Sequence, residues 1–241
     1  MLGDDDLHVW RTSLDVPDTM VERLRQILSL DERVRADRFH FQIDRHRFIT
    51  ARGCLRIILA QYVPSRPSEI RFSYGSHGKP SAANASARSA ELKFNLAHSA
   101  GLALYAITRR CEIGVDLEQI RADFATDQIA EHFFSPNEVV RLRSLPISKQ
   151  KEAFFNCWTR KEAFIKAKST GLSQALDQFE VTVSPDESAA LLGTKWDQAE
   201  APRWLLKSID LGSGFAAALA FEGRDRRISY WDFDNNMIRE S

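Results

Sequence analysis

The sequence predicts an α+β fold, and two observations favour it. Segments with helical spacing of apolar residues and short segments of strand character occur together twice along the chain, with a join near residues 108–110. The 241 residues suffice for one large domain or two smaller ones, and either arrangement buries a substantial core. No tight sequence repeat is visible, so this pattern by itself leaves open whether the two parts share one fold.

In the first part, a helix is expected to open at 15–18, and a single long, arginine-rich helix is expected over 29–62. Pro64 and Pro67 end the long helix because proline lacks the amide hydrogen and clashes with the preceding turn. Its buried side is expected to consist of Val34, Phe39, Ile43, Phe48, Leu55, Ile58 and Leu59. Strands are expected at 7–10, 70–72, 94–96 and 102–107, with a loop at 75–89.

In the second part, Ser135 and Pro136 mark the start of a helix, with serine as the N-cap and proline in the first helical position. Helices are expected at 129–134, 136–145 and 148–168. Strands are expected at 112–118, 179–183, 204–209, 215–221 and 228–233.

Composition excludes two broad classes of protein. Lys and Arg together number 33, as do Asp and Glu, and the formal net charge is zero. Hydrophobic residues make up 44% and charged residues 27%, which is ordinary for a globular protein and unlike a disordered chain. A nucleic-acid binder that relies on overall positive charge is excluded, so attraction to a charged partner requires a local patch.

Neither the first residues nor the cysteines indicate a secreted protein. The run Asp4-Asp5-Asp6 follows the first three residues, the opposite of a basic segment preceding an apolar one, so no secretory signal is expected. No apolar run approaches membrane length. The three cysteines are odd in number and far apart, so we expect reduced thiols in a cytoplasmic protein rather than a disulfide framework or a zinc knuckle.

The strand 113–118 carries two carboxylates on one face. Successive side chains of a strand point to opposite faces, so Asp116 and Glu118 lie roughly 7 Å apart on the same side, beside Gly114. Two like charges on a half-buried strand repel, and a cation or a basic partner would relieve that repulsion. The alternative is a solvated polar face of an amphipathic strand.

The helix 148–168 carries a second constellation. Trp158, Glu162 and Lys166 are four residues apart and therefore share one helix face. The helix is otherwise rich in apolar residues, which indicates that the charges of Glu162 and Lys166 are partly desolvated. The alternative is an ordinary surface ion pair between Glu162 and Lys166.

Several basic side chains could bind an anion. His98 ends a predicted strand before a turn, and Lys79 lies between Gly78 and Pro80 on a stiff turn. The long helix contributes Arg33, Arg35, Arg38, Arg45, Arg47, Arg52 and Arg56, and guanidinium groups bind phosphate bidentately. For each the alternative is structural: a histidine bonded to backbone, a solvated lysine, or a helix face with salt links. No P-loop, dinucleotide-binding glycine motif, nucleophile elbow or zinc-protease motif occurs.

Taken in order, these signals resemble the 4′-phosphopantetheinyl transferases, in the larger, monomeric class that activates nonribosomal peptide and polyketide synthases. The resemblance covers roughly residues 29–183, and the acidic strand combined with the Trp-x-x-Lys-Glu-Ala helix makes it specific. The matching motifs are Asp31 to Phe39, Asp44 to Phe48, Gly78-Lys79-Pro80, Phe94 to Ser99, Gly114 to Glu118, Phe133-Phe134-Ser135 and Trp158 to Lys166.

The resemblance implies a fold and a reaction. The fold is a pseudo-dimer of two similar α+β halves with the active site at their interface, here expected as residues 1–109 and 110–241. The first half would bind the adenosine and phosphates of coenzyme A, and the second would hold the metal and catalytic residues. The reaction moves the phosphopantetheine arm of coenzyme A to a serine of a carrier protein, needs Mg²⁺ and releases adenosine 3′,5′-bisphosphate. A monomer is expected, since the second half replaces a partner subunit.

The resemblance also implies residue roles. Asp116, Glu118 and Glu162 would hold the metal, and Glu162 would also be the candidate base for the incoming serine. Because a bound cation favours the ionised form of a carboxylate, a metal-bound water is the alternative base. Lys166 would stabilise developing phosphate charge or assist the leaving group. The catalytic set is thus Glu162, Lys166 and Asp116, and the coenzyme A-binding set is Arg35, Arg47, Arg52, Lys79, Pro80, Asn95, His98 and Lys166.

Two departures from the family pattern stand out. Ala97 replaces a common serine, and the helix 148–168 is followed by Ser169-Thr170-Gly171 instead of a Gly-x-Gly ending.

Two other functions remain open. A catalytically silent protein of another class could bind coenzyme A or a carrier domain without transfer. A scaffold with coincidental charges would not bind coenzyme A at all.

Overall fold

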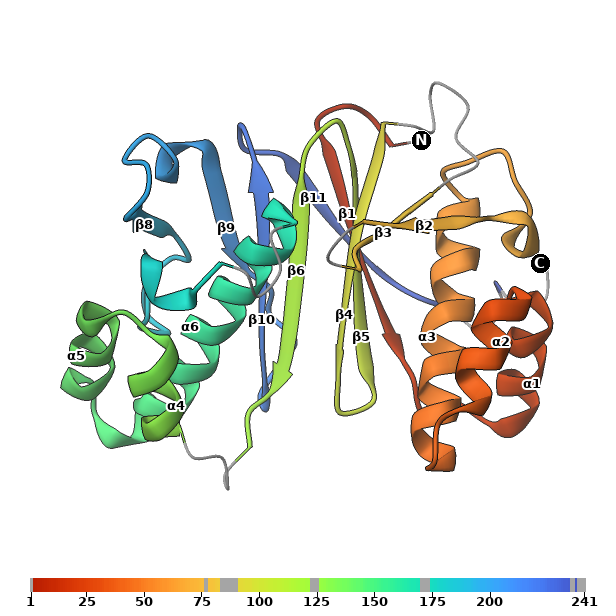
Figure 1. The fold of residues 1–241 in the computed structure, drawn as a ribbon, viewed down its shortest axis with the longest axis horizontal. Helices are drawn as coiled ribbons and strands as arrows, with labels where there is room; N and C mark the ends of the chain where they lie inside the picture. Colours follow the sequence, from red (N-terminus) through yellow and green to blue (C-terminus); the bar gives the residue numbers. More distant parts are fainter. Residues whose placement is uncertain are drawn as a thin grey trace.

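Two β-sheets lie side by side in the middle of the molecule, and helices cover the outer side of each (Figure 1). The computed structural model describes residues 2–75, 78–82, 91–121, 126–169, 174–234 and 237. Within this part of the chain, no helix is both long enough and apolar enough to cross a membrane. The three cysteines are free thiols and buried, as expected from their number and spacing.

The two parts of the chain contain helices and strands in the same kind of sequence. The first contains β1 (Asp6–Ser13), α1 (Asp18–Ile27), α2 (Leu30–Asp37), α3 (Gln42–Ala60), β2 (Phe72–Tyr74), β3 (Pro80–Ala82), β4 (Leu92–Ser99) and β5 (Leu102–Arg109). The second contains β6 (Ile113–Gln119), α4 (Thr126–Phe133), α5 (Pro136–Ser144), α6 (Ile147–Lys168), β7 (Phe179–Val181), β8 (Leu191–Thr194), β9 (Trp204–Ser208), β10 (Phe215–Glu222) and β11 (Arg227–Asp232).

The sheet topology repeats, and it confirms the α+β fold with two similar halves. The first sheet contains the order β1-β5-β4 and the second the order β6-β10-β9, with antiparallel pairing throughout these six strands. In both halves a long helix, α3 or α6, and a small two-stranded hairpin separate the first strand from the other two. Strand β11 then returns to the first sheet and pairs in parallel with β1.

Three apolar clusters hold these layers together. One lies between the first sheet and α1 to α3, and another between the second sheet and α4 to α6. The third lies between the two sheets and includes Ala97, Leu104, Val115 and Leu219. Because the odd-numbered residues of β6 enter this third cluster, the even-numbered residues face α6, as the alternation of the strand predicts.

The prediction of a single helix over 29–62 is wrong. The chain leaves helical geometry after Asp37 and resumes it at Gln42, and the Arg45 guanidinium donates to the Phe39 carbonyl left unpaired at the break. Val34 and Ile43, expected in the core, are 44% and 50% exposed. Helix α2 turns inward a different face, which carries the buried carboxylate of Glu32 instead.

The other elements agree with the sequence, with small differences. The strand expected at 70–72 begins at Phe72, and the strands β3 and β8 were not expected. Strand β3 falls within the loop expected at 75–89, of which residues 76, 77 and 83–89 lie outside the described residues. Both are short and carry no alternating apolar pattern, so the sequence holds little signal for them.

Candidate active site

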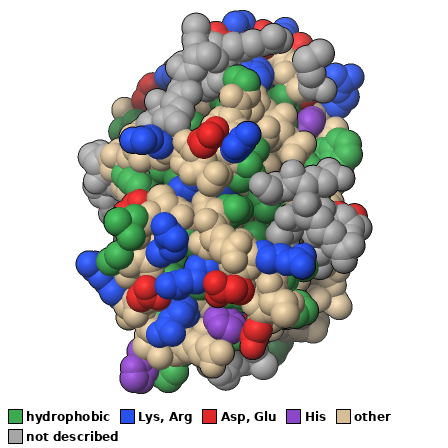
Figure 2. Space-filling view, turned by 90° about the vertical axis from the view of Figure 1, so that its right-hand side faces the viewer, with side chains coloured by type: hydrophobic (Ala, Val, Ile, Leu, Met, Phe, Trp, Pro, Cys, Tyr) green, Lys and Arg blue, Asp and Glu red, His purple; other side chains and the backbone are tan. Residues whose placement is uncertain are grey.

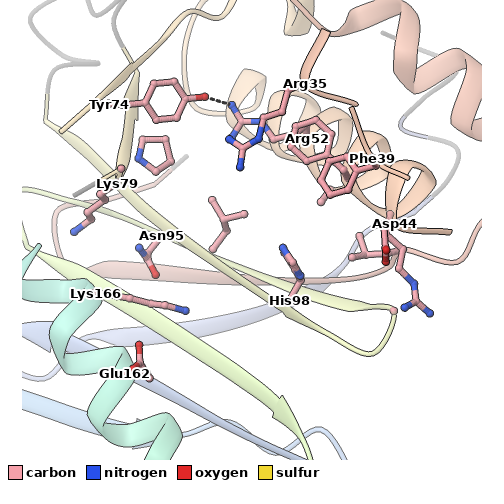
Figure 3. Close-up of a pocket in the computed structure, with 18 of the residues that line it drawn as sticks. Arg35, Phe39, Asp44, Arg52, Tyr74, Lys79, Asn95, His98, Glu162 and Lys166 are labelled. Atoms are coloured by element: carbon pink, nitrogen blue, oxygen red, sulfur yellow. Dashed lines mark hydrogen bonds between the residues drawn. The ribbon is translucent and has the colours of Figure 1, made fainter. Parts of the chain in front are cut away.

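A cavity of about 710 Å³ opens between the two halves. One wall comes from α2, α3, the β2–β3 hairpin and the end of β4, and the other comes from α6 (Figure 3). The eight residues implied as coenzyme A-binding all line this cavity, namely Arg35, Arg47, Arg52, Lys79, Pro80, Asn95, His98 and Lys166. Glu162 lines it as well, whereas Asp116 and Glu118 lie outside its lining.

The acidic face of β6 packs against α6, with Asp116 buried and Glu118 half-buried. Asp116 is 5% exposed, and its Oδ1 accepts a hydrogen bond from the Lys166 ammonium at 2.6 Å. The sequence spacing suggested a pair between Lys166 and Glu162, but Glu162 forms no ion pair with a described residue. Among the described residues, Oδ2 of Asp116 also has no hydrogen-bond partner, so a buried oxygen of the site is left unsatisfied.

The three carboxylates repel one another. Burial raises the pKa of Glu162, and the charge of Asp116 raises it further against the opposing effect of Lys166. Burial likewise raises the pKa of Glu118, and Asp116 adds to that increase. The hydroxyl of Ser99 donates to Glu118 Oε2 at 3.0 Å and partly offsets the shift. Lys166 pairs with Asp116, and the charges of Lys166 and Arg121 lower the pKa of Glu118, but burial and the neighbouring carboxylates still leave the pKa values of Glu118 and Glu162 raised.

The donor set matches a hard divalent cation, although its members do not converge in the structure. Among the described residues, no group of three or more His, Cys, Asp or Glu side chains is gathered closely enough to hold a metal ion. The Asp116 Oδ2 without a hydrogen-bond partner and the raised pKa values of Glu118 and Glu162 nevertheless fit carboxylates whose repulsion a bound cation would relieve. Oxygen ligands of this kind suit Mg²⁺.

Basic side chains line the opposite wall, and several have protein partners. Arg47 forms two hydrogen bonds with Asp15, at 2.7 and 2.8 Å. The Lys79 ammonium donates to Glu112, to the Ile113 carbonyl at the start of β6 and to the Ala167 carbonyl at the C-terminal end of α6.

The remaining cations differ in how far they are neutralised. Arg52 binds the buried carboxylate of Glu32, which also binds Arg56. The guanidinium of Arg35 lies 5.3 Å from the centre of the Phe48 ring and pairs with no described carboxylate. Desolvation by its surroundings lowers the pKa of His98, and the charge of Lys166 lowers it further. Arg35 thus has no carboxylate partner among the described residues, whereas the lowered pKa of His98 favours its neutral form.

The outer side of the first half is electrically mixed. Lys and Arg alternate with Asp and Glu over this face (Figure 2). Arg25 and Asp37, for example, form a bidentate pair between α1 and α2. The structural alternative for the arginine-rich segment therefore holds on the outside, while Arg35, Arg47 and Arg52 face the cavity.

The cavity also contains residues that sequence reasoning missed. Tyr74, Phe39, Phe48 and Ile165 give it apolar walls, and the Tyr74 hydroxyl accepts a hydrogen bond from Arg52 at 2.8 Å. Phe39 and Phe48 were predicted on the buried side of the long helix and instead line the cavity, and Tyr74 lies in none of the motifs, so only the fold places these side chains here.

The two departures from the family pattern have structural counterparts. Ala97 packs in the cluster between the sheets and does not line the cavity. Ser169 ends α6 in the left-handed conformation at φ +57°, a position where glycine is favoured. Thr170 and Gly171 lie outside the described residues.

Comparisons with known proteins agree with this arrangement. Residues 112–220 match the family model of the 4′-phosphopantetheinyl transferase superfamily, and residues 14–109 match that of the N-terminal part of 4′-phosphopantetheinyl transferases. The 4′-phosphopantetheinyl transferase HetI of Nostoc sp. is 38% identical over 229 residues, covering 95% of this chain and 93% of that protein. The 4′-phosphopantetheinyl transferase Sfp of Bacillus subtilis is 29% identical, covering 70% of this chain and 73% of that protein.

A solved structure overlaps only half of the molecule. The holo-(acyl-carrier-protein) synthase of Bacillus anthracis, in complex with coenzyme A, covers 46% of this chain and 94% of its own, with 21% identity and a TM-score of 0.37. The two family models together with the identity to HetI decide the assignment. This chain belongs to the 4′-phosphopantetheinyl transferase superfamily, in its larger, Sfp-like class.

Proposed function

We propose that this chain transfers the 4′-phosphopantetheine arm of coenzyme A to a serine of an apo carrier protein and releases adenosine 3′,5′-bisphosphate. One observation carries the proposal: a single cavity joins a basic wall from the first half to Glu162 and Lys166 of the second. A substrate with phosphates at both ends of a nucleoside needs such a wall, and a displacement at phosphorus needs charge stabilisation beside it. Family membership supports the same reaction.

The division of labour follows the two halves. We assign binding of the adenosine and its phosphates to residues 1–109, where Arg35, His98 and Lys79 line the cavity. We assign catalysis to residues 110–241, which contribute Glu162 and Lys166 to it. Arg47 and Arg52 also line the basic wall, and each forms an ion pair, with Asp15 and Glu32 respectively. These pairs fix the positions of the two guanidinium groups and partly neutralise their charge.

The reaction balances with groups of this chain. The serine oxygen of the carrier attacks the phosphorus that bears the pantetheine, and the bond from that phosphorus to the bridging pyrophosphate oxygen breaks. The serine proton passes to the Glu162 carboxylate, which lines the cavity and forms no ion pair with a described residue. The Lys166 ammonium stabilises the charge that develops on the departing phosphate.

Asp116, Glu118 and Glu162 would hold a Mg²⁺ ion, as the orphaned Asp116 oxygen and the shared repulsion of the set suggest. When bound, the ion neutralises pyrophosphate oxygens and so lowers the barrier to displacement. We also propose that the chain acts as a monomer, because its two halves supply both walls of the cavity. The three buried free thiols support a reducing, cytoplasmic setting.

Intact-mass analysis of a carrier protein tests the proposal. The protein is incubated with coenzyme A, Mg²⁺ and an apo carrier, repeated with carriers of fatty-acid, polyketide and peptide synthesis. One added phosphopantetheine is expected, and none on a carrier whose acceptor serine is alanine. Tight coenzyme A binding with unchanged mass for every carrier would favour the catalytically silent alternative, and absence of coenzyme A binding would favour the scaffold.

A further inference from the structure

The two sheets meet at the edge strands β4 and β6, which do not form a ladder with each other. Two side chains of β4 bind the amides of β6 instead. The Val115 amide donates to Asn95 Oδ1 at 2.9 Å, and the Gln119 amide donates to Ser99 Oγ at 3.1 Å. Val115 and Gln119 are four residues apart, as are Asn95 and Ser99, and amides of residues an even number apart point to the same strand edge, so Asn95 and Ser99 fix the register of β6 against β4.

Ser99 makes a further contact that Asn95 does not. Its hydroxyl donates to Glu118 Oε2 at 3.0 Å while it accepts from the next amide along the strand. A hydroxyl has one proton to donate, so this proton is committed to the Glu118 carboxylate. Ser99 thereby fixes both the backbone at the end of β6 and the orientation of its acidic side chain.

The platform that holds Ser99 is rigid. Ser99 pairs with Leu102 across a two-residue turn, and both turn residues, Ala100 and Gly101, have positive φ, at +47° and +82°. The Gly101 carbonyl accepts a hydrogen bond from the Leu14 amide at 2.7 Å. A Cβ atom on Gly101 would overlap the carboxylate of Asp15, so the tip of the hairpin is enclosed on that side as well.

Glu118 needs such support because of where it lies. It is the last residue but one of β6, half-buried, and the following residue, Gln119, is exposed. A glutamate at this position has three rotatable bonds and is repelled by Asp116 on the same face. Lys166 and Arg121 attract this carboxylate through their charges, but among the described residues Ser99 supplies its hydrogen bond.

We propose that Ser99 is a positioning residue for the reaction: its hydroxyl holds the Glu118 carboxylate toward Asp116 and keeps β6 in register with β4. The inference rests on the proposed function, in which Glu118 helps to hold a divalent cation. Groups that orient a metal ligand typically contribute 10–100-fold in metal affinity or activity. Ser99 does not line the cavity, so its removal should leave coenzyme A binding unchanged.

The test compares Ser99→Ala with Ser99→Thr, which keeps the hydroxyl, and with Ser73→Ala, a hydroxyl on the β2–β3 hairpin that contacts Ser81. Mn²⁺ binding to each protein without coenzyme A is followed by electron paramagnetic resonance. We expect the half-saturating Mn²⁺ concentration to rise about 10-fold in Ser99→Ala and to stay near wild type in the other two. Carrier modification should show a matching rise in the Mg²⁺ requirement, with an unchanged KM for coenzyme A.

A double-mutant cycle with Glu118→Gln separates positioning from loss of fold. If Ser99 acts through Glu118, Ser99→Ala should have little further effect on Mn²⁺ binding in the Glu118→Gln background. An equal loss in both backgrounds, wild-type Mn²⁺ binding by Ser99→Ala, or no Mn²⁺ binding by the wild type would each overturn the inference. A wild type that binds Mn²⁺ but modifies no carrier would instead refute the proposed function.

Discussion

The ammonium of Lys166 lies 2.6 Å from Oδ1 of Asp116, although Lys166 follows Glu162 by one helical turn. The pair joins α6 to β6 rather than two turns of the same helix. It leaves Glu162 facing the cavity with no ionic partner among the described residues, and burial and Asp116 raise its pKa. This arrangement separates Glu162, the proposed proton acceptor, from Lys166, the group that carries positive charge.

Glu162→Gln should abolish transfer without harming the fold. The variant removes the proton acceptor, and we expect carrier modification to fall at least about 100-fold. Because the folded pKa of Glu162 is raised, its charge destabilises the folded state at neutral pH. In the absence of divalent cations the variant should therefore melt at the same or a higher temperature than the wild type at pH 8.

The difference in melting temperature between Glu162→Gln and the wild type should depend on pH. A group with a raised folded pKa contributes stability below its unfolded pKa and loses it as pH rises through the folded pKa. The advantage of Glu162→Gln should thus shrink as pH falls toward the ordinary glutamate value of 4.5. A variant that melts well below the wild type at pH 8 would show that Glu162 is structural.

Gly114→Ala should destabilise the protein strongly. A Cβ atom at Gly114 would overlap the Ala163 carbonyl and the Ala167 amide of α6, and both are backbone atoms that cannot move alone. Overpacking of this kind costs about 3 kcal/mol, or about 6–12 °C in melting temperature for a chain of this size. The control is Gly193→Ala on β8, where no atom lies within 4 Å, and equal melting of the two variants would contradict the packing.

Glu32 should stabilise the fold above acidic pH. Burial alone would raise its pKa, but Arg52 and Arg56 outweigh burial and hold the pKa below the ordinary value of 4.5. Glu32→Gln leaves two buried guanidinium groups without their carboxylate, and we expect a loss of about 3–5 kcal/mol at pH 7 in urea unfolding. Breaking an exposed ion pair on the outer face, such as that of Arg25 with Asp37, should lower the free energy of unfolding far less, by about 0–1 kcal/mol.

That difference should disappear in acid. A depressed folded pKa gives stability above the unfolded pKa, which is lost as pH falls through the folded pKa. The wild type and Glu32→Gln should therefore converge below pH 4.5. A gap that stays constant with pH would mean that the amide disrupts packing instead of removing a charge.

His98 should link coenzyme A binding to protons. Its pKa is lowered from 6.5 by desolvation and then by the charge of Lys166, so it is largely neutral at pH 7. A bound phosphate would raise that pKa, and affinity should rise by up to about tenfold per pH unit as pH falls below neutrality. Calorimetry of His98→Gln, in which only the ligand titrates, should lack this component, and identical pH profiles would exclude contact between His98 and phosphate.

Much of the site could be predicted because strand and helix periodicities place side chains without further information. The alternation of 113–118 correctly put Val115 and Leu117 in the core and Asp116 on the opposite face. What covers that opposite face is a tertiary question, and the structure answers it with α6. The partner of Lys166 depends on the same packing, which is why its spacing from Glu162 suggested the wrong pair.

The basic segment shows the opposite limit. Arginine spacing indicated an anion site but could not show that Glu32, on another helix, binds Arg52. Nor could it show the break between α2 and α3, since no proline or glycine marks residues 38–41. Tyr74 joins the cavity through a hairpin whose strands are too short to carry a periodic signal.

The most direct test is a crystal structure of this protein soaked with coenzyme A and Mn²⁺, in which anomalous scattering locates the ion. We predict one ion in contact with carboxylate oxygens of Asp116, Glu118 and Glu162, with the pyrophosphate of coenzyme A beside it and the adenosine against the basic wall. An ion bound elsewhere, or coenzyme A seated outside this cavity, would contradict the account.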